Sequence, residues 1–165
     1  MPGHDQQGIP EPIWLVGRGP VGERWVTVEG LEMVSRAQVL VHEAPAEPWL
    51  AGRAHPGTLH LEGVLVEMID RILEETVQGR CVVCLCTGDP LLDQGGLALA
   101  QALQAAGRAY RIIPGITEIQ KQAVAVGLPL AEALKSGGLL LEPARVVSSE
   151  HPSRGGRSTI LWGEA

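Results

Sequence analysis

Short apolar runs alternate with longer amphipathic segments over most of the chain. The runs have the length and character of buried strands and lie at 13–16, 39–41, 81–86 and 110–113, and residues 58–61 are a further candidate for a brief strand. Between them apolar residues recur every three or four positions, which predicts helices at 23–36, 64–79, 97–106 and 116–126. Strands that alternate with such helices pair in parallel through right-handed crossovers. The pattern therefore predicts an α/β fold, a doubly wound, mostly parallel sheet with helices on both faces.

The periodic pattern weakens after residue 130. Proline-rich residues 44–58 read as a loop, and 130–135 as a short helix, while 158–162 resemble a strand. We expect a polar lead over 1–12, one α/β domain over 13–130 and a short tail over 131–165. The tail is too short to form a second α/β domain with its own core, so we expect it to add a strand or helix to the first.

Composition narrows the function classes. The 165 residues are 45% hydrophobic and 19% charged, which is typical of globular proteins and excludes intrinsic disorder. The sequence contains no apolar stretch long enough for a membrane span, and its first residues do not form a secretory signal, so we expect a cytoplasmic protein. A net charge of −6 disfavours binding to nucleic acid or to an anionic membrane.

Three cysteines lie close together at Cys81, Cys84 and Cys86. A zinc site needs a fourth ligand at suitable spacing, and a redox pair is typical of a helix N-terminus, where the thiolate is stabilised. This cluster lies in a predicted strand instead, with Cys84 and Cys86 on one face and Cys81 roughly opposite. We therefore expect buried, unreactive thiols and no metal.

Glycine-containing turns follow three of the predicted strands, at 17–20, 87–90 and 114–117. The carboxyl ends of parallel strands meet at one edge of a sheet, and ligands bind there. Taken singly, each turn could be an ordinary connection between strand and helix. Together, with Asp89 and Thr117 as polar side chains, they favour a small-molecule site. The dinucleotide fingerprint is matched poorly and a phosphate-binding loop of the Gly-Lys-Ser/Thr type is absent.

Four motifs follow one another in order over residues 13–130. They are 14–20 (WLVGRGP) with Thr27 and 37–43 (AQVLVHE), 79–90 (GRCVVCLCTGDP) with glycines 95–96, 106–117 (AGRAYRIIPGIT), and 125–130 (AVGLPL). This series resembles the tetrapyrrole (corrin/porphyrin) methylases, with the nearest likeness to the uroporphyrinogen-III C-methyltransferases.

The resemblance implies a methyltransferase dependent on S-adenosylmethionine, which becomes S-adenosylhomocysteine, with the ligand held between two α/β domains. The methyl-donor positions it implies are Pro20, Thr87, Gly88, Asp89, Leu92, Thr117 and Glu118. Glu43 stands where the family has an aspartate proposed as proton acceptor, and Arg53 is the cation nearest to the position of a missing lysine. The family's second domain has no counterpart after residue 130, so we expect that domain to be truncated. The resemblance also implies a homodimer.

The resulting hypothesis is an S-adenosylmethionine-binding protein, with methyl transfer to a tetrapyrrole as its implied activity. Two alternatives remain open, a non-catalytic relic that acts as a binding or regulatory subunit, and a methyltransferase of the same fold with another acceptor. His42 and His60 are expected to be structural, because no second ligand or nucleophile lies at a matching spacing.

Overall fold

A computed structural model of the chain describes residues 11–20, 22–43, 45–92, 94–131, 139–143 and 158–162. The chain divides into two compact units, Met1–Ile116 and Thr117–Ala165. Most of the polar lead lies outside the described residues, and the expected domain boundary at residue 130 stays a prediction. No described helix is both long and apolar enough to cross a membrane.

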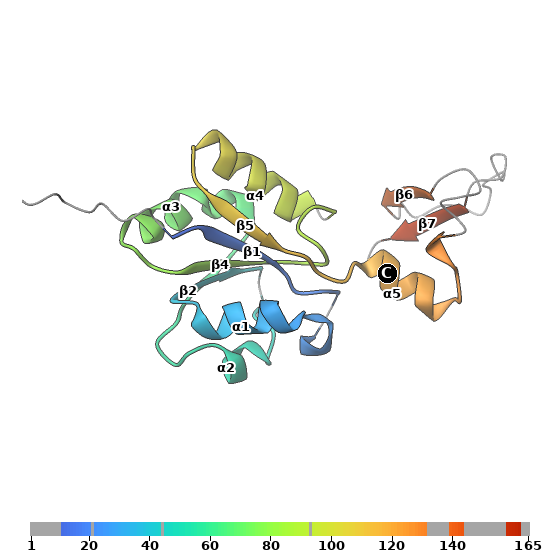
Figure 1. The fold of residues 1–165 in the computed structure, drawn as a ribbon, viewed down its shortest axis with the longest axis horizontal. Coiled ribbons are helices and arrows are strands. Elements are labelled where there is room, and N and C mark those ends of the chain that lie inside the picture. Colours follow the sequence, from blue (N-terminus) through green and yellow to red (C-terminus); the bar gives the residue numbers. More distant parts are fainter. Residues whose placement is uncertain are drawn as a thin grey trace, which may run out of the picture. The chain divides into compact units, whose positions relative to one another are not determined.

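The first unit is built on a sheet of five parallel strands (Figure 1). The strands are β1 (Ile13–Gly17), β2 (Val39–His42), β3 (Leu59–Glu62), β4 (Val82–Cys86) and β5 (Tyr110–Ile113). Their order across the sheet is β3-β2-β4-β1-β5, and in this register Leu15 lies between Cys84 and Ile112. All five strands lie where the sequence predicted strands, so the predicted parallel α/β sheet is confirmed.

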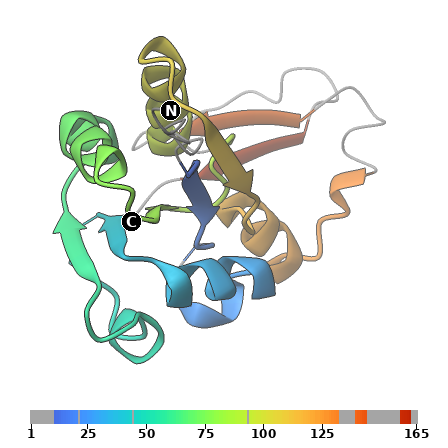
Figure 2. The same cartoon turned by 60° about the vertical axis from the view of Figure 1, so that its left-hand side comes forward.

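Helices cover both faces of this sheet (Figure 2). One face carries α1 (Val28–Arg36) and α2 (Leu50–Arg53), and the other carries η2 (Leu65–Met68), α3 (Ile69–Val77) and α4 (Gln94–Ala105). Alternate strand residues supply the two cores. The core under α3 and α4 contains Leu15, Val41, Cys84, Ile72, Leu99 and Leu103, and the opposite core contains Val16, Leu40, Leu85, Met33, Val34 and Leu50. Each buried leucine contributes about 1.5–3 kcal/mol relative to exposure.

The expected single helix over 23–36 is wrong, because the segment is broken at Thr27. A short 3-10 turn, η1 (Glu23–Trp25), precedes the break. Thr27 has extended backbone angles, with φ −67° and ψ 157°, and its hydroxyl accepts a hydrogen bond from the amide of Gly30 at 3.1 Å. Thr27 is thus the N-cap of α1, a role that threonine fills well. The expected loop at 44–58 also contains one short helix, α2.

The cysteines lie as their alternation predicts. Cys84 and Cys86 are fully buried in the core under α3 and α4, and Cys81 packs against the opposite core. Burial raises the pKa of the Cys84 thiol well above its ordinary value, and Cys86 adds to the effect. Burial and the charge of Glu11 likewise raise the pKa of Cys81. Among the described residues, no three metal-binding side chains come together.

The second unit contains α5 (Glu118–Ala125) and a two-stranded parallel sheet of β6 (Leu139–Pro143) and β7 (Ser158–Trp162). Thr117 begins α5 through a capping box, in which Thr117 and Gln120 bond each other's backbone amides. Ile119 and Ala123 pack against Leu128 and Leu130. The expected helix at 130–135 is described only over residues 130–131, and its remainder lies outside the described residues.

Three glycines bring the turns after β1, β4 and β5 into direct backbone contact. A Cβ atom on Gly17 would lie 2.5 Å from the Gly115 nitrogen and 2.6 Å from the Gly88 carbonyl oxygen. A Cβ on Gly115 would lie 2.8 Å from the Gly17 Cα and closer still to the Gly88 oxygen. These neighbours are backbone atoms within the sheet, so a side chain at either position would force the turns apart.

Gly115→Ala is therefore expected to lower the free energy of unfolding by about 1–3 kcal/mol, the usual cost of overpacking a rigid site. Urea unfolding followed by tryptophan fluorescence measures this change. Gly52→Ala is the matched control, because a Cβ on Gly52 meets nothing within 4 Å and alanine favours the helix. Equal stability of the Gly115 variant and the wild type would show that the turns are not closely packed.

Candidate functional site

The direction in which the chain crosses the sheet reverses between β1 and β4, because β1 connects to β2 on one side and β4 connects to β5 on the other. Strands β1 and β4 are adjacent and parallel, but α1 leaves β1 toward one face and α4 leaves β4 toward the other. Two neighbouring turns that diverge in this way leave a crevice outside the carboxyl ends of the strands, where open α/β sheets bind their ligands. The turns at 17–20 and 87–90 lie at this point.

These turns are joined by backbone hydrogen bonds as well as by close packing. The Gly88 amide donates to the Gly19 carbonyl at 3.0 Å, and the Arg18 amide donates to the Cys86 carbonyl at 2.9 Å. With Gly115 packed against Gly17, the predicted convergence of the three turns is confirmed for their residues in the first unit. Pro20 and Gly88, two of the predicted ligand positions, are buried within these turns.

Asp89 links two of the turns through its carboxylate. One oxygen, Oδ1, accepts a hydrogen bond from the Leu91 amide at 2.9 Å, and the other, Oδ2, accepts one from the Gly115 amide at 3.1 Å. A carboxylate oxygen can accept more than one hydrogen bond. Asp89 is partly exposed, so its carboxylate remains able to accept bonds from the hydroxyl or ammonium groups of a ligand.

Two leucines beside Asp89 are exposed. Leu91 and Leu92 have exposed fractions of 56% and 58% in the turn that leads toward α4. Leu92 is one of the residues that the resemblance places at the methyl donor. Exposed apolar side chains next to an oriented carboxylate form the mixed surface that small-molecule sites present to a ligand with polar and apolar parts.

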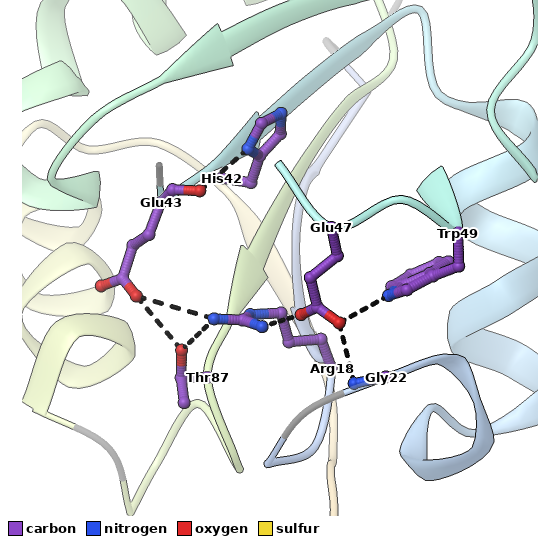
Figure 3. Close-up of polar contacts among 7 residues, drawn as sticks. All are labelled: Arg18, Gly22, His42, Glu43, Glu47, Trp49 and Thr87. Atoms are coloured by element: carbon purple, nitrogen blue, oxygen red, sulfur yellow. Dashed lines mark hydrogen bonds and ion pairs between the residues drawn. The ribbon is translucent and has the colours of Figure 1, made fainter. Parts of the chain in front are cut away.

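Arg18 lies between two glutamates at this edge, Glu43 and Glu47 (Figure 3). Its Nη2 donates to the Thr87 hydroxyl oxygen at 2.7 Å, and the Thr87 hydroxyl in turn donates to Glu43 Oε2 at 3.2 Å. The Arg18 Nη2 also lies 3.8 Å from Glu43 Oε2. The turn after β1 is therefore tied by charge to the loop after β2.

The two glutamates differ in how many partners they have and in how exposed they are. Glu47 accepts hydrogen bonds from Arg18, from the Gly22 amide at 2.8 Å and from the Trp49 indole nitrogen at 2.8 Å. Its side chain is 16% exposed, whereas that of Glu43 is 47% exposed. Glu47 thus anchors the loop. The other Glu43 oxygen, Oε1, has no hydrogen-bond partner among the described residues and lies at the carboxyl ends of the strands.

Sequence reasoning did not find Arg18 or Glu47. Neither residue was assigned a role from the sequence, and Arg53 was named as the cation nearest to the position of a missing lysine. In the structure Arg53 pairs with Glu23, and the cation beside Glu43 is Arg18. A signal was present, because a partly buried arginine at a ligand-binding edge requires a counter-charge, which the acidic loop after β2 supplies.

His42 and His60 form a hydrogen-bonded pair beneath Glu43. The His42 Nδ1 lies 3.1 Å from the Glu43 carbonyl oxygen, which can only accept, so Nδ1 donates. The neutral His42 ring then accepts at Nε2 from His60 Nδ1, 3.2 Å away. Burial, with a smaller contribution from His42, lowers the pKa of His60. The pair fixes the end of β2 against β3, as expected of structural histidines.

The remaining predicted ligand positions, Thr117 and Glu118, belong to the second unit. The Thr117 hydroxyl accepts from the Gln120 amide at 3.1 Å, and Glu118 pairs with Lys121 at 3.2 Å. Both residues open α5, whose N-terminus favours negatively charged groups. Their assignment to the methyl donor stays a prediction, as does that of the other ligand positions.

Solved structures share this fold. A cobalt precorrin-4 methyltransferase described as a cobalamin biosynthetic enzyme superposes with a TM-score of 0.70 at 24% identity, covering 86% of this chain and 61% of the other. A uroporphyrin-III C-methyltransferase from Thermus thermophilus gives a TM-score of 0.62 at 28% identity, covering 72% and 54%. A further structure of the Thermus enzyme, at 24% identity and a TM-score of 0.62, is a complex with S-adenosyl homocysteine and covers 79% and 54%.

Curated relatives are similar in sequence to more than two thirds of this chain. The cobalt-precorrin-4 C(11)-methyltransferase of Priestia megaterium is 28% identical over 121 residues, which are 68% of this chain and 45% of that protein. The uroporphyrinogen-III C-methyltransferase of Synechococcus elongatus is 24% identical over 135 residues, 76% and 56%. The chain thus spans about half the length of these relatives. The family model for tetrapyrrole (corrin/porphyrin) methylases matches residues 12–160, and the chain belongs to this family.

Proposed function

We propose that this chain binds S-adenosylmethionine at the carboxyl edge of its five-stranded sheet and takes part in methyl transfer to a tetrapyrrole. The observation that carries this proposal is the convergence of the glycine turns, with Asp89 bonded to both Leu91 and Gly115. Relatives of the chain are named as tetrapyrrole methyltransferases, and a structure of the same fold was solved with S-adenosyl homocysteine.

The residues at this edge suit the chemical groups of the donor. Asp89 offers carboxylate lone pairs to hydroxyl or ammonium groups, since each oxygen has one amide partner in the structure. Leu92 offers an exposed apolar side chain to a flat ring. Thr87 and Gly88 form the turn that leads to Asp89, and Pro20 belongs to the facing turn after β1. When bound, S-adenosylmethionine supplies an electrophilic methyl group on a sulfonium.

Glu43 is the proposed proton acceptor. Transfer of the methyl group from the sulfonium to a ring carbon releases S-adenosylhomocysteine and leaves a positive charge on the tetrapyrrole. The ring system loses that charge as a proton, and a carboxylate within reach of the proton can take it. One Glu43 oxygen is held by Thr87 and faces Arg18, and the half-exposed side chain leaves the other accessible. Thr87, Arg18 and Glu47 act as positioning residues, because they hold the loop that carries Glu43 at the turn after β4.

In the second unit Thr117 and Glu118 are proposed as further donor contacts. The tetrapyrrole acceptor, the homodimer and the cytoplasmic location expected from the sequence stay predictions. The alternative of a non-catalytic binding subunit shares the donor site but lacks the transfer step, so binding and transfer are tested separately.

Calorimetric titration with S-adenosylhomocysteine tests the donor site. Wild type is expected to bind at a single site, and Leu92→Glu to bind at least about tenfold more weakly, because it places a charge where the ligand's apolar part would lie. Val77→Glu introduces the same charge at a side chain that is 76% exposed on α3 and should bind as wild type does. Absence of saturable binding by folded wild-type protein would remove the proposal.

Transfer of a labelled methyl group to uroporphyrinogen III tests the catalytic step. Glu43→Gln is expected to lower kcat about 100-fold or more, the typical contribution of a general base, while S-adenosylhomocysteine binding persists. Glu67→Gln is the control, since Glu67 is an exposed residue of η2. Donor binding without transfer by the wild type would favour the binding-subunit alternative. Transfer only to RNA or protein would favour another acceptor.

A further inference from the structure

A pocket lies at the end of the sheet where the parallel strands begin, opposite the proposed donor site. It has a volume of about 700 Å³ and is lined by the end of α1, the two residues between α1 and β2, the segment that enters β3, and Arg80. This size is within the range of small-molecule sites. The proposed donor site is at the carboxyl ends of the same strands, so the two sites are separate. We propose that this amino-edge pocket binds a phosphate-bearing small molecule.

The charge of the lining differs from that of the whole protein. The chain carries a net charge of −6, yet the described residues that line the pocket include Arg36 and Arg80 and no aspartate or glutamate. Two arginines on one small concave surface attract oxyanions and can bond them through paired N–H groups. A locally cationic pocket on an acidic protein therefore selects for anions.

Two polar side chains of the pocket, Gln38 and His55, are oriented so that they can donate hydrogen bonds. The Gln38 side-chain oxygen accepts from the Cys81 amide at 2.9 Å, which leaves the Gln38 NH₂ group to donate. The His55 Nδ1 accepts from the Gly57 amide at 3.2 Å, so in the neutral ring the proton is at Nε2, which can donate as well. Phosphate is an acceptor of such bonds at every oxygen.

Neighbouring contacts hold this surface in place. Arg80 donates to Glu75 at 2.6 Å, and Glu75 is almost fully buried and also pairs with Arg71 at 2.9 Å. The Thr58 hydroxyl donates to the Ala37 carbonyl at 2.8 Å, which joins the start of β3 to that of β2. Arg80 is thus fixed by an ion pair, whereas Arg36 is an exposed residue at the end of α1 and can adjust to a ligand.

The test is titration of the full chain with inorganic pyrophosphate at physiological ionic strength. We expect saturable binding to wild type and a loss of affinity of about tenfold in Arg36→Gln, the effect of removing one charge-assisted contact. Arg36→Lys should recover part of the affinity. Arg24→Gln removes the same charge from an exposed position outside the pocket and should leave affinity unchanged. Thermal unfolding confirms that each variant is folded.

Three results would overturn the proposal. The first is no saturable pyrophosphate binding by folded wild type, and the second is equal weakening by Arg24→Gln and Arg36→Gln, which would indicate general attraction to charge. The third is tighter binding of citrate than of pyrophosphate, which would assign the pocket to carboxylates. Leu92→Glu should bind pyrophosphate as wild type does. Unchanged pyrophosphate binding by this variant would show that the amino-edge pocket and the donor site are independent. A failure of one proposal can therefore be told from a failure of the other.

Discussion

Direct backbone contact among Gly17, Gly88 and Gly115 is the constraint on which the rest of the site depends. At Gly17 and Gly115 a single added carbon would meet main-chain atoms of a neighbouring turn. These atoms lie at or directly after the carboxyl ends of β1, β4 and β5, so their positions are set by the pairing of β1 with β4 and with β5. The contact places Asp89 where it reaches the Gly115 amide, and it places Arg18 where it reaches Thr87.

Charge pairing then organises the loop after β2 around this rigid edge. Arg18 is a partly buried cation, and leaving it unpaired would cost more free energy than its packing contributes. Glu47 supplies the close partner and also gathers the Gly22 amide and the Trp49 indole. Glu43 shares the Arg18 charge at a longer distance and keeps an accessible oxygen. Glu47 therefore stabilises the loop, and the Glu43 carboxylate remains accessible to a ligand.

The two edges of the sheet have different polar character. The carboxyl edge combines carboxylates with exposed leucines, which suits a ligand with hydroxyl, ammonium and apolar parts. The amino edge presents arginines and amide donors without acidic residues among the described lining, which suits an oxyanion. In a parallel sheet the loops before the strands and the loops after the strands are different segments of the chain. One domain can therefore carry two chemically distinct surfaces.

Local sequence determined the elements and their approximate places. Apolar runs marked four of the five strands, and β3 was found as a brief segment of alternating character. Alternation separated Cys84 and Cys86 from Cys81, because side chains on a strand point to opposite faces in turn. The motif order was also enough to indicate the family, and the glycine turns indicated that three loops meet at the carboxyl ends of the strands. The break at Thr27 was missed, because helical periodicity continues across it while capping depends on a hydrogen bond to Gly30.

Only the tertiary structure decided that Arg18 lies beside Glu43, that Glu47 is an anchor, and that Arg36 and Arg80 share a pocket. These pairings join residues from different strands and loops, and the distances between them are set by sheet order, which no local pattern encodes.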